Sequence, residues 1–100
     1  MDNKATAQAQ QHARAQSVLV TTGDLQAKHE PISVIFAVGT DEKVLFTQPN
    51  PQLAFARATA QLQQSAAQLD GHAVVHCSFG YYADRGQIVV TGYGTVVRLV

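Results

Sequence analysis

The sequence has no tryptophan and only one cysteine, so the chain cannot form an internal disulfide. It also has little charge: seven lysines and arginines balance seven aspartates and glutamates, and no stretch gathers enough basic side chains to bind a phosphate backbone. We therefore do not expect nucleic acid as a partner. The single cysteine and an amino terminus without an apolar signal run predict a cytoplasmic protein.

Long apolar runs are also missing, and none approaches the roughly 20 residues that cross a bilayer, so no membrane partner is expected. Hydrophobic residues still make up 46% of the 100 residues, against 14% charged residues, which is typical of a folded domain. A single domain of this size hides only about 60 to 70% of its unfolded surface. Burial between subunits would therefore add to its stability.

The chain divides into a polar segment and an apolar body. Residues 1–16 are mostly alanine, glutamine and other polar residues, with no valine, leucine, isoleucine, phenylalanine or tyrosine to pack a core. We interpret them as a flexible or partly helical tail. The alternative is a helical arm that pairs with a neighbouring molecule, because alanine and glutamine tolerate a helix well. Residues 17–100 are predicted to form one domain.

Four segments of the body are predicted to be strands: 18–22, a segment that follows Pro31, 72–82 and 87–100. The last two are joined by residues 83–86, a length that predicts a hairpin. In the second strand alternate residues are apolar, which predicts one buried face; these are Ile32, Val34, Phe36 and Val38. In the fourth strand Ile88, Val89 and Val90 are consecutive, a pattern typical of a strand covered on both faces.

One long helix is predicted between the second and third strands. Asn50 can cap free backbone N–H groups, and Pro51 suits the first helical position, so the helix should begin there and run to about Leu69. Its apolar residues fall at helical spacings on one stripe, namely Phe55, Ala58, Leu62, Ala66 and Leu69. Asp70-Gly71 should end the helix, because glycine readily takes the left-handed conformation.

These elements predict an α+β fold of order β-β-α-β-β, an antiparallel sheet with one long helix packed on it. A single helix can cover only one face of the sheet. Strands that are apolar on both sides need a second cover, and another copy of the chain is the simplest one. The sequence therefore predicts a homo-oligomer.

Several short motifs, in this order and spacing, resemble the YbjQ-like family, small bacterial and archaeal proteins named for heavy-metal binding. The motifs are Val-Leu-Val-Thr-Thr at 18–22, Ala-Ala-Gln-Leu-Asp-Gly-His-Ala-Val-Val at 66–75, Tyr81, and Gly-Thr-Val-Val at 94–97. The resemblance implies an α+β subunit assembled into a ring, as a homopentamer or decamer. Residues 41–50 are too few for the glycine-rich insertion that the family usually carries, so no site on that insertion is carried over.

The residues available for a metal site are one cysteine and four histidines. His76 and Cys77 are neighbours on a predicted strand, so their side chains should point to opposite faces, and His72 lies about 13 Å from His76 along the strand. Hence His76 and Cys77 are candidate metal ligands only across subunits of a ring. The alternative is that Cys77 is a small core residue in line with Ala73, Val75 and Phe79, and that His76 lies at an interface or surface.

No catalytic pattern is present, because the serines lack a glycine-framed nucleophile turn and the acids form no spaced pair, so we expect no enzyme. Tyr81, Tyr82 and Tyr93 could stack on an aromatic ligand or simply pack. Two functions remain. One is a ring-forming binding protein that holds a metal, oxyanion or small ligand between subunits. The other is an interaction module that oligomerises, has no ligand, and displays its amino-terminal tail to a protein partner.

Overall fold

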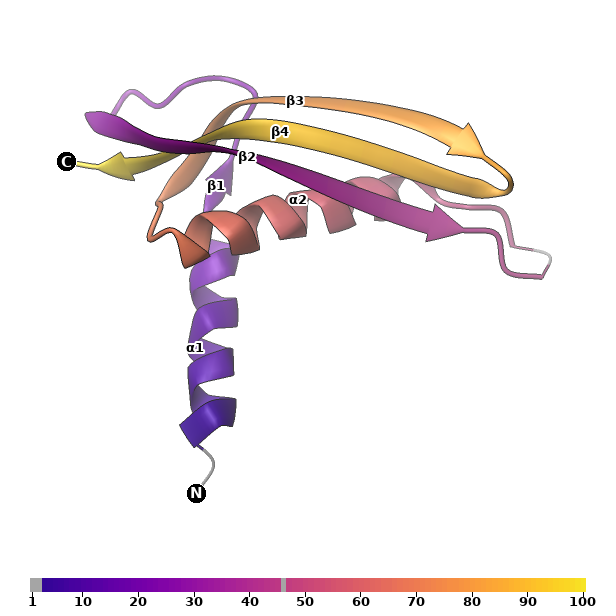
Figure 1. The fold of residues 1–100 in the computed structure, drawn as a ribbon, viewed down its shortest axis with the longest axis horizontal. Coiled ribbons are helices and arrows are strands. Elements are labelled where there is room, and N and C mark those ends of the chain that lie inside the picture. Colours follow the sequence, from indigo (N-terminus) through magenta and orange to yellow (C-terminus); the bar gives the residue numbers. More distant parts are fainter. Residues whose placement is uncertain (1–2, 46) are drawn as a thin grey trace.

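The computed structural model describes residues 3–45 and 47–100, and within them the side chains of all but residues 3–5, 8 and 11. A four-stranded sheet, one helix packed across it and a second helix that projects from the body make up the fold (Figure 1). In chain order the elements are α1 (Asn3–Ser17), β1 (Leu19–Val20), β2 (His29–Glu42), α2 (Pro51–Gln68), β3 (Ala73–Asp84) and β4 (Gln87–Leu99). The predicted α+β class is confirmed.

The strand order is β1-β3-β4-β2, with β4 antiparallel to both of its neighbours. The prediction of a wholly antiparallel sheet is wrong, because the two-residue β1 pairs parallel with β3, Leu19 opposite Ala73. The hairpin between β3 and β4 is tighter than predicted. Asp84 pairs with Gln87 across a two-residue turn, in which Arg85 and Gly86 both have positive φ, as a hairpin with right-handed strand twist requires.

Helix α2 begins as its sequence indicates: the Asn50 side chain accepts a hydrogen bond from the Gln52 N–H at 2.9 Å, and Pro51 occupies the first turn. At the other end the prediction about glycine is wrong, because Asp70 takes the left-handed conformation, with φ of 59°. Gly71 is needed for space, since a Cβ there would meet the Val96 side chain.

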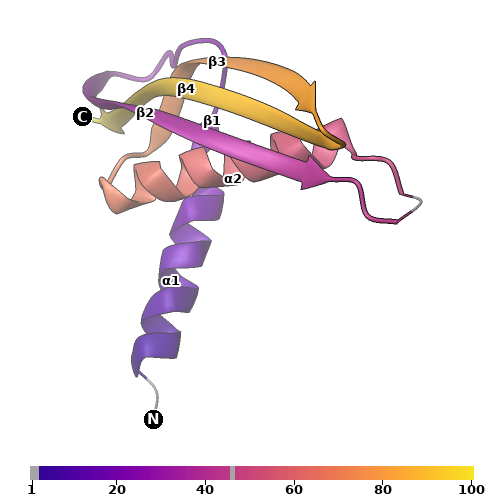
Figure 2. The ribbon, with the colours of Figure 1, turned by 45° about the vertical axis from the view of Figure 1, so that its right-hand side comes forward.

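Helix α2 packs across the sheet (Figures 1 and 2), and it is buried at Ala54, Ala58, Leu62 and Ala66, and at Ala67 beside α1. Three members of the predicted stripe are among them, whereas Phe55 and Leu69 are partly exposed at its margins. Small residues let the helix lie close to the sheet. At Gly39 the approach is closest, because a Cβ there would overlap the Ala54 carbonyl oxygen and the Ala58 nitrogen.

Two β-bulges decide which strand residues face α2. In β2 the register shifts at Ile32, so Ile35 and Ala37 face the helix-side core, while Val34, Phe36 and Val38 are exposed on the opposite face. The predicted stripe through Ile32 is therefore split between the two faces. An extra residue in one strand reverses the inside–outside alternation beyond it, which a strict two-residue period cannot anticipate.

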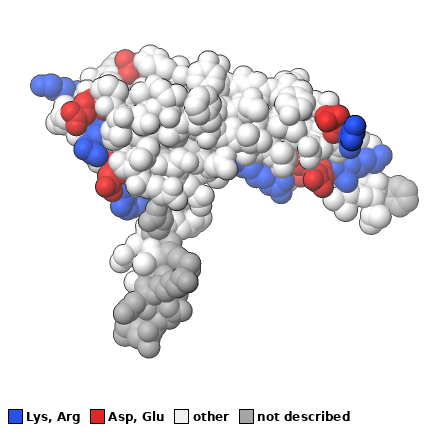
Figure 3. Space-filling view, viewed as in Figure 1, with Lys and Arg blue, Asp and Glu red and all other residues white. Residues whose placement is uncertain are grey.

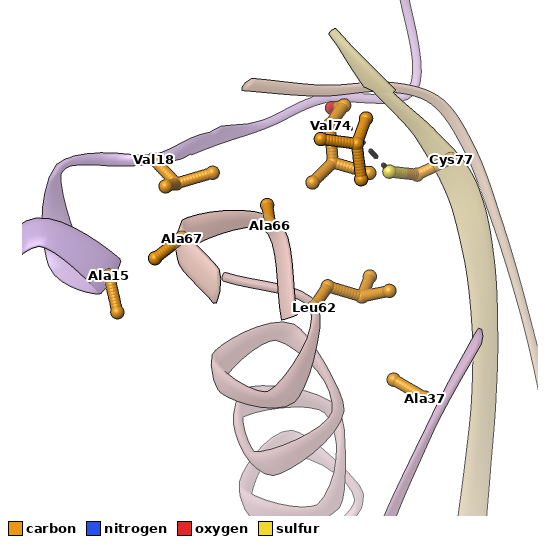
Figure 4. Close-up of a cluster of buried hydrophobic side chains, with 9 residues drawn as sticks. Ala15, Val18, Ala37, Leu62, Ala66, Ala67, Val74 and Cys77 are labelled. Carbon is orange, nitrogen blue, oxygen red and sulfur yellow. Dashed lines mark hydrogen bonds between the residues drawn. The ribbon is translucent and has the colours of Figure 1, made fainter. Parts of the chain in front are cut away.

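The second bulge lies at His76 and Cys77, which together oppose the single residue Gly94. Before it, Val74 packs on the helix side and Val75 on the other; beyond it, Cys77 packs on the helix side with Val74 (Figure 4). The predicted alignment of Cys77 with Ala73 and Val75 is therefore wrong. Gly94 accommodates the bulge, because a Cβ there would lie 2.7 Å from the Cys77 Sγ atom.

Residues 3–17 form helix α1. The last turn of α1 docks on α2: Ala15 is buried, and the Arg14 guanidinium donates hydrogen bonds to the Ala67 carbonyl at 3.0 Å and the Asp70 carboxylate at 2.7 Å. The Arg14 hydrogen bond and charge lower the pKa of Asp70. Farther from the body, the described side chains of α1 are exposed and the helix points away from the sheet (Figures 1 and 2).

Candidate functional site

The structure separates the two predicted metal ligands. Cys77 is buried between the sheet and α2, where its thiol donates a hydrogen bond to the Val74 carbonyl oxygen at 3.6 Å (Figure 4). Burial raises the pKa of this thiol, which favours the protonated form over the thiolate that binds soft metals. In one subunit Cys77 therefore has the surroundings of a small core residue, and a ligand role across subunits would require it to be uncovered.

His76 points the other way, and its side chain is 63% exposed. It is the residue of the β3 bulge with positive φ, 52°, a conformation that favours glycine. Its Nε2 atom lies 3.7 Å from Oδ2 of Asp24. On the same carboxylate, Oδ1 lies 3.3 Å from Nε2 of His29, whose side chain is 20% exposed. We call Asp24, His29 and His76 the Asp24 cluster.

The loop of residues 21–28 carries Asp24 to this position. Its backbone continues the contact with β3 beyond β1: Thr21 N–H donates to the Val74 carbonyl at 3.0 Å, and His76 N–H donates to the Gly23 carbonyl at 2.9 Å. The Leu25 side chain then packs on Ala73, Val75 and Val97, on the sheet face away from α2. The loop is therefore anchored on both sides of Asp24.

Sequence reasoning missed Asp24 and His29. Asp24 is one of the acids that form no spaced pair in the sequence, and His29 has no motif around it. Asp24 and His29 are five residues apart, whereas His76 is distant in the chain and meets them only because the loop folds over the sheet. His72, which the sequence placed on the same strand as His76, bonds elsewhere. Its Nδ1 atom accepts a hydrogen bond from the Leu99 N–H at 3.0 Å.

A second feature is the sheet face that neither α2 nor the loop covers. Its exposed apolar residues come from three adjacent strands and comprise Val34, Phe36, Val38, Tyr82 and Tyr93, which we call the open sheet face. The rings of Phe36 and Tyr93 lie 6.0 Å apart, centroid to centroid. Charged side chains gather toward the two ends of the body, and its middle is free of them in the view of Figure 3. Exposed apolar side chains that gather on one face make that face a candidate interaction surface.

The three tyrosines do not converge on one site. Tyr82 and Tyr93 lie on the open sheet face, whereas Tyr81 lies on the opposite side, beside a shallow pocket that it lines with Pro51, Gln52, Phe55 and Val90. A ligand stacked on Tyr81 would therefore touch neither of the other two rings in the same subunit.

No family model matches the chain, and no curated protein sequence matches it either. Among solved structures, the fold is similar to that of a protein of unknown function from Pediococcus pentosaceus that belongs to the DUF74 family. The TM-score is 0.67 at 20% sequence identity, over 83% of this chain and 98% of the other. The likeness establishes the fold alone. Neither helix described here is long and apolar enough to cross a membrane.

Proposed function

We propose that the chain is a self-associating binding protein, whose copies pack through the open sheet face into a ring and hold a small ligand or ion between subunits. The observation that carries the proposal is the open sheet face itself. Helix α2 covers one side of the sheet and the 21–28 loop covers one end of the other, which leaves five large apolar side chains in water. A second copy offers the same apolar surface, and burying it is favourable.

The edge of β2 is a poorer candidate for the contact than the face. Side chains of α2 reach over this edge: the Gln61 amide oxygen accepts a hydrogen bond from the Val38 N–H at 2.7 Å, and the Arg57 guanidinium donates to the Thr40 carbonyl at 2.6 Å. These bonds occupy backbone groups that another strand would need. The resemblance to YbjQ-like proteins, which implies a homopentamer or decamer, supports a ring as the form of the assembly.

Sedimentation at micromolar concentration tests the proposal. Phe36→Ser should shift the wild-type oligomer toward single subunits, because Phe36 is 73% exposed at the centre of the proposed contact. Tyr81→Ser is the matched control: Tyr81 is 75% exposed but lies on the other side of the sheet, so the oligomer should persist. A folded wild-type protein that sediments as a monomer would refute the proposal, as would equal effects of the two substitutions.

The projection of α1 favours a second candidate function, an interaction module without a ligand. In an oligomer, each subunit would present one α1 helix, and several copies bind a multivalent partner more tightly than one. Elemental analysis and absorbance of untagged protein, purified without added metal, separate the candidates. A stoichiometric ligand that is lost when Phe36→Ser dissociates the subunits supports the first. An oligomer without ligand, whose partner binding requires residues 1–12, supports the second.

A further inference from the structure

We propose that Asp24, His29 and His76 form a site for one first-row divalent metal ion, such as Zn²⁺ or Co²⁺, within a single chain. The donor set is two imidazoles and one carboxylate, the types that such ions bind. The site is distinct from the ligand position proposed between subunits and does not rest on self-association.

The distances suit donor atoms that share an ion. Zinc–nitrogen and zinc–oxygen bonds are about 2.1 Å long, so two donors on a tetrahedral ion lie about 3.4 Å apart. Nε2 of His29 lies 3.3 Å and Nε2 of His76 lies 3.7 Å from the nearer oxygen of Asp24. As they stand, no three such side chains in the described part of the chain enclose an ion. The exposed His76 side chain has room to turn and close the set.

The hydrogen bond at Nδ1 of His29 orients its Nε2 atom toward the same position. Its Nδ1 atom lies 2.7 Å from the Ala27 carbonyl oxygen, and only an N–H can bond to a carbonyl. In the neutral ring Nε2 therefore carries a lone pair, and this lone pair faces the Asp24 carboxylate. Two acceptors at 3.3 Å repel unless a proton or a metal ion lies between them, and a metal ion can take the place of the proton. A backbone carbonyl on Nδ1 is also the usual support of a histidine that binds metal through Nε2.

The backbone holds the three groups in place before any ion binds. The Leu25 N–H donates to Oδ1 of Asp24 at 2.8 Å, and the His76 N–H bonds to the same loop. His76 holds its ring beside Asp24 from a left-handed backbone position that glycine would occupy with less strain. If this position had only a structural role, glycine would fill it with less strain. A role of the imidazole as a ligand would explain why histidine is present instead.

Titration with Co²⁺ and Zn²⁺ at pH 7.5 tests the site, because bound Co²⁺ absorbs visible light according to its ligands and calorimetry gives the Zn²⁺ stoichiometry. We expect one ion per chain and a loss of affinity of at least about tenfold for Asp24→Asn, His29→Ala and His76→Gly. His76→Gly relieves the backbone strain, so it should fold normally, and Zn²⁺ should raise the melting temperature of the wild type but not of this variant. His72→Ala is the control and should bind as the wild type does.

The same titration on Phe36→Ser separates this site from the proposed self-association. Binding that persists in dissociated subunits supports a site complete in one chain. Binding lost on dissociation, binding unchanged in all three cluster variants, or no binding by the wild type would each overturn the proposal. A monomeric wild type that still binds one ion would refute self-association and leave the metal site standing.

Discussion

Replacing Leu62 with alanine tests how α2 packs on the sheet. Leu62 is 0% exposed and lies in the cluster with Ala37, Val74 and Val96 (Figure 4). Truncating a buried leucine costs about 2 to 5 kcal/mol, and the cost is greatest where the surroundings cannot close the cavity. Here the helix already touches backbone at Gly39, so it cannot move closer to the sheet. We therefore expect a loss in the upper part of that range, about 3 to 5 kcal/mol.

Such a loss is a large share of the total free energy of unfolding of a domain, which is usually about 5 to 15 kcal/mol. It should lower the melting temperature by about 12 °C or more, since each kcal/mol shifts a domain of this size by about 4 to 8 °C. Urea denaturation followed by circular dichroism gives the free energy directly. Every sample needs the same protein concentration, because association adds to apparent stability.

Leu53→Ala is the matched control, on the same helix but 41% exposed, and should cost less than about 1 kcal/mol. The midpoint should move while the denaturant slope stays constant, which shows that stability rather than compactness has changed. A loss below about 0.5 kcal/mol for Leu62→Ala, or equal losses for both leucines, would refute the assignment of the buried helix face.

Two further predictions concern the sheet. Gly39→Ala should cost about 1 to 3 kcal/mol in urea denaturation, because its Cβ meets the α2 backbone. Gly23→Ala, where the nearest atom is 3.8 Å from the new Cβ, should cost less, and equal losses would contradict the close approach. Cys77 should react with iodoacetamide far more slowly in the folded protein than in urea. Because burial raises its folded pKa above 9.0, stability should decline as the pH rises past that value, and Cys77→Ala should reduce this decline.

The sequence by itself determined the features that depend on neighbouring residues. The cap at Asn50, the start at Pro51 and the centre of the α2 stripe at Leu62 follow from local hydrogen bonding and helical period. The hairpin and the α+β class follow from strand patterns separated by a short polar turn. The docking of α1 could not be predicted, because it depends on a bond from Arg14 to residues more than 50 positions away.

Only the tertiary structure decided which way the strand side chains point and which distant residues meet. One extra residue at Ile32 and another at His76 reverse the alternation in β2 and β3, so Phe36 lies in water and Cys77 in the core. Asp24 reaches His76 because its loop bonds to the edge of β3. Periodicity reports the local conformation of a segment, whereas bulges and loop docking are set by the fit between segments that are distant in the chain.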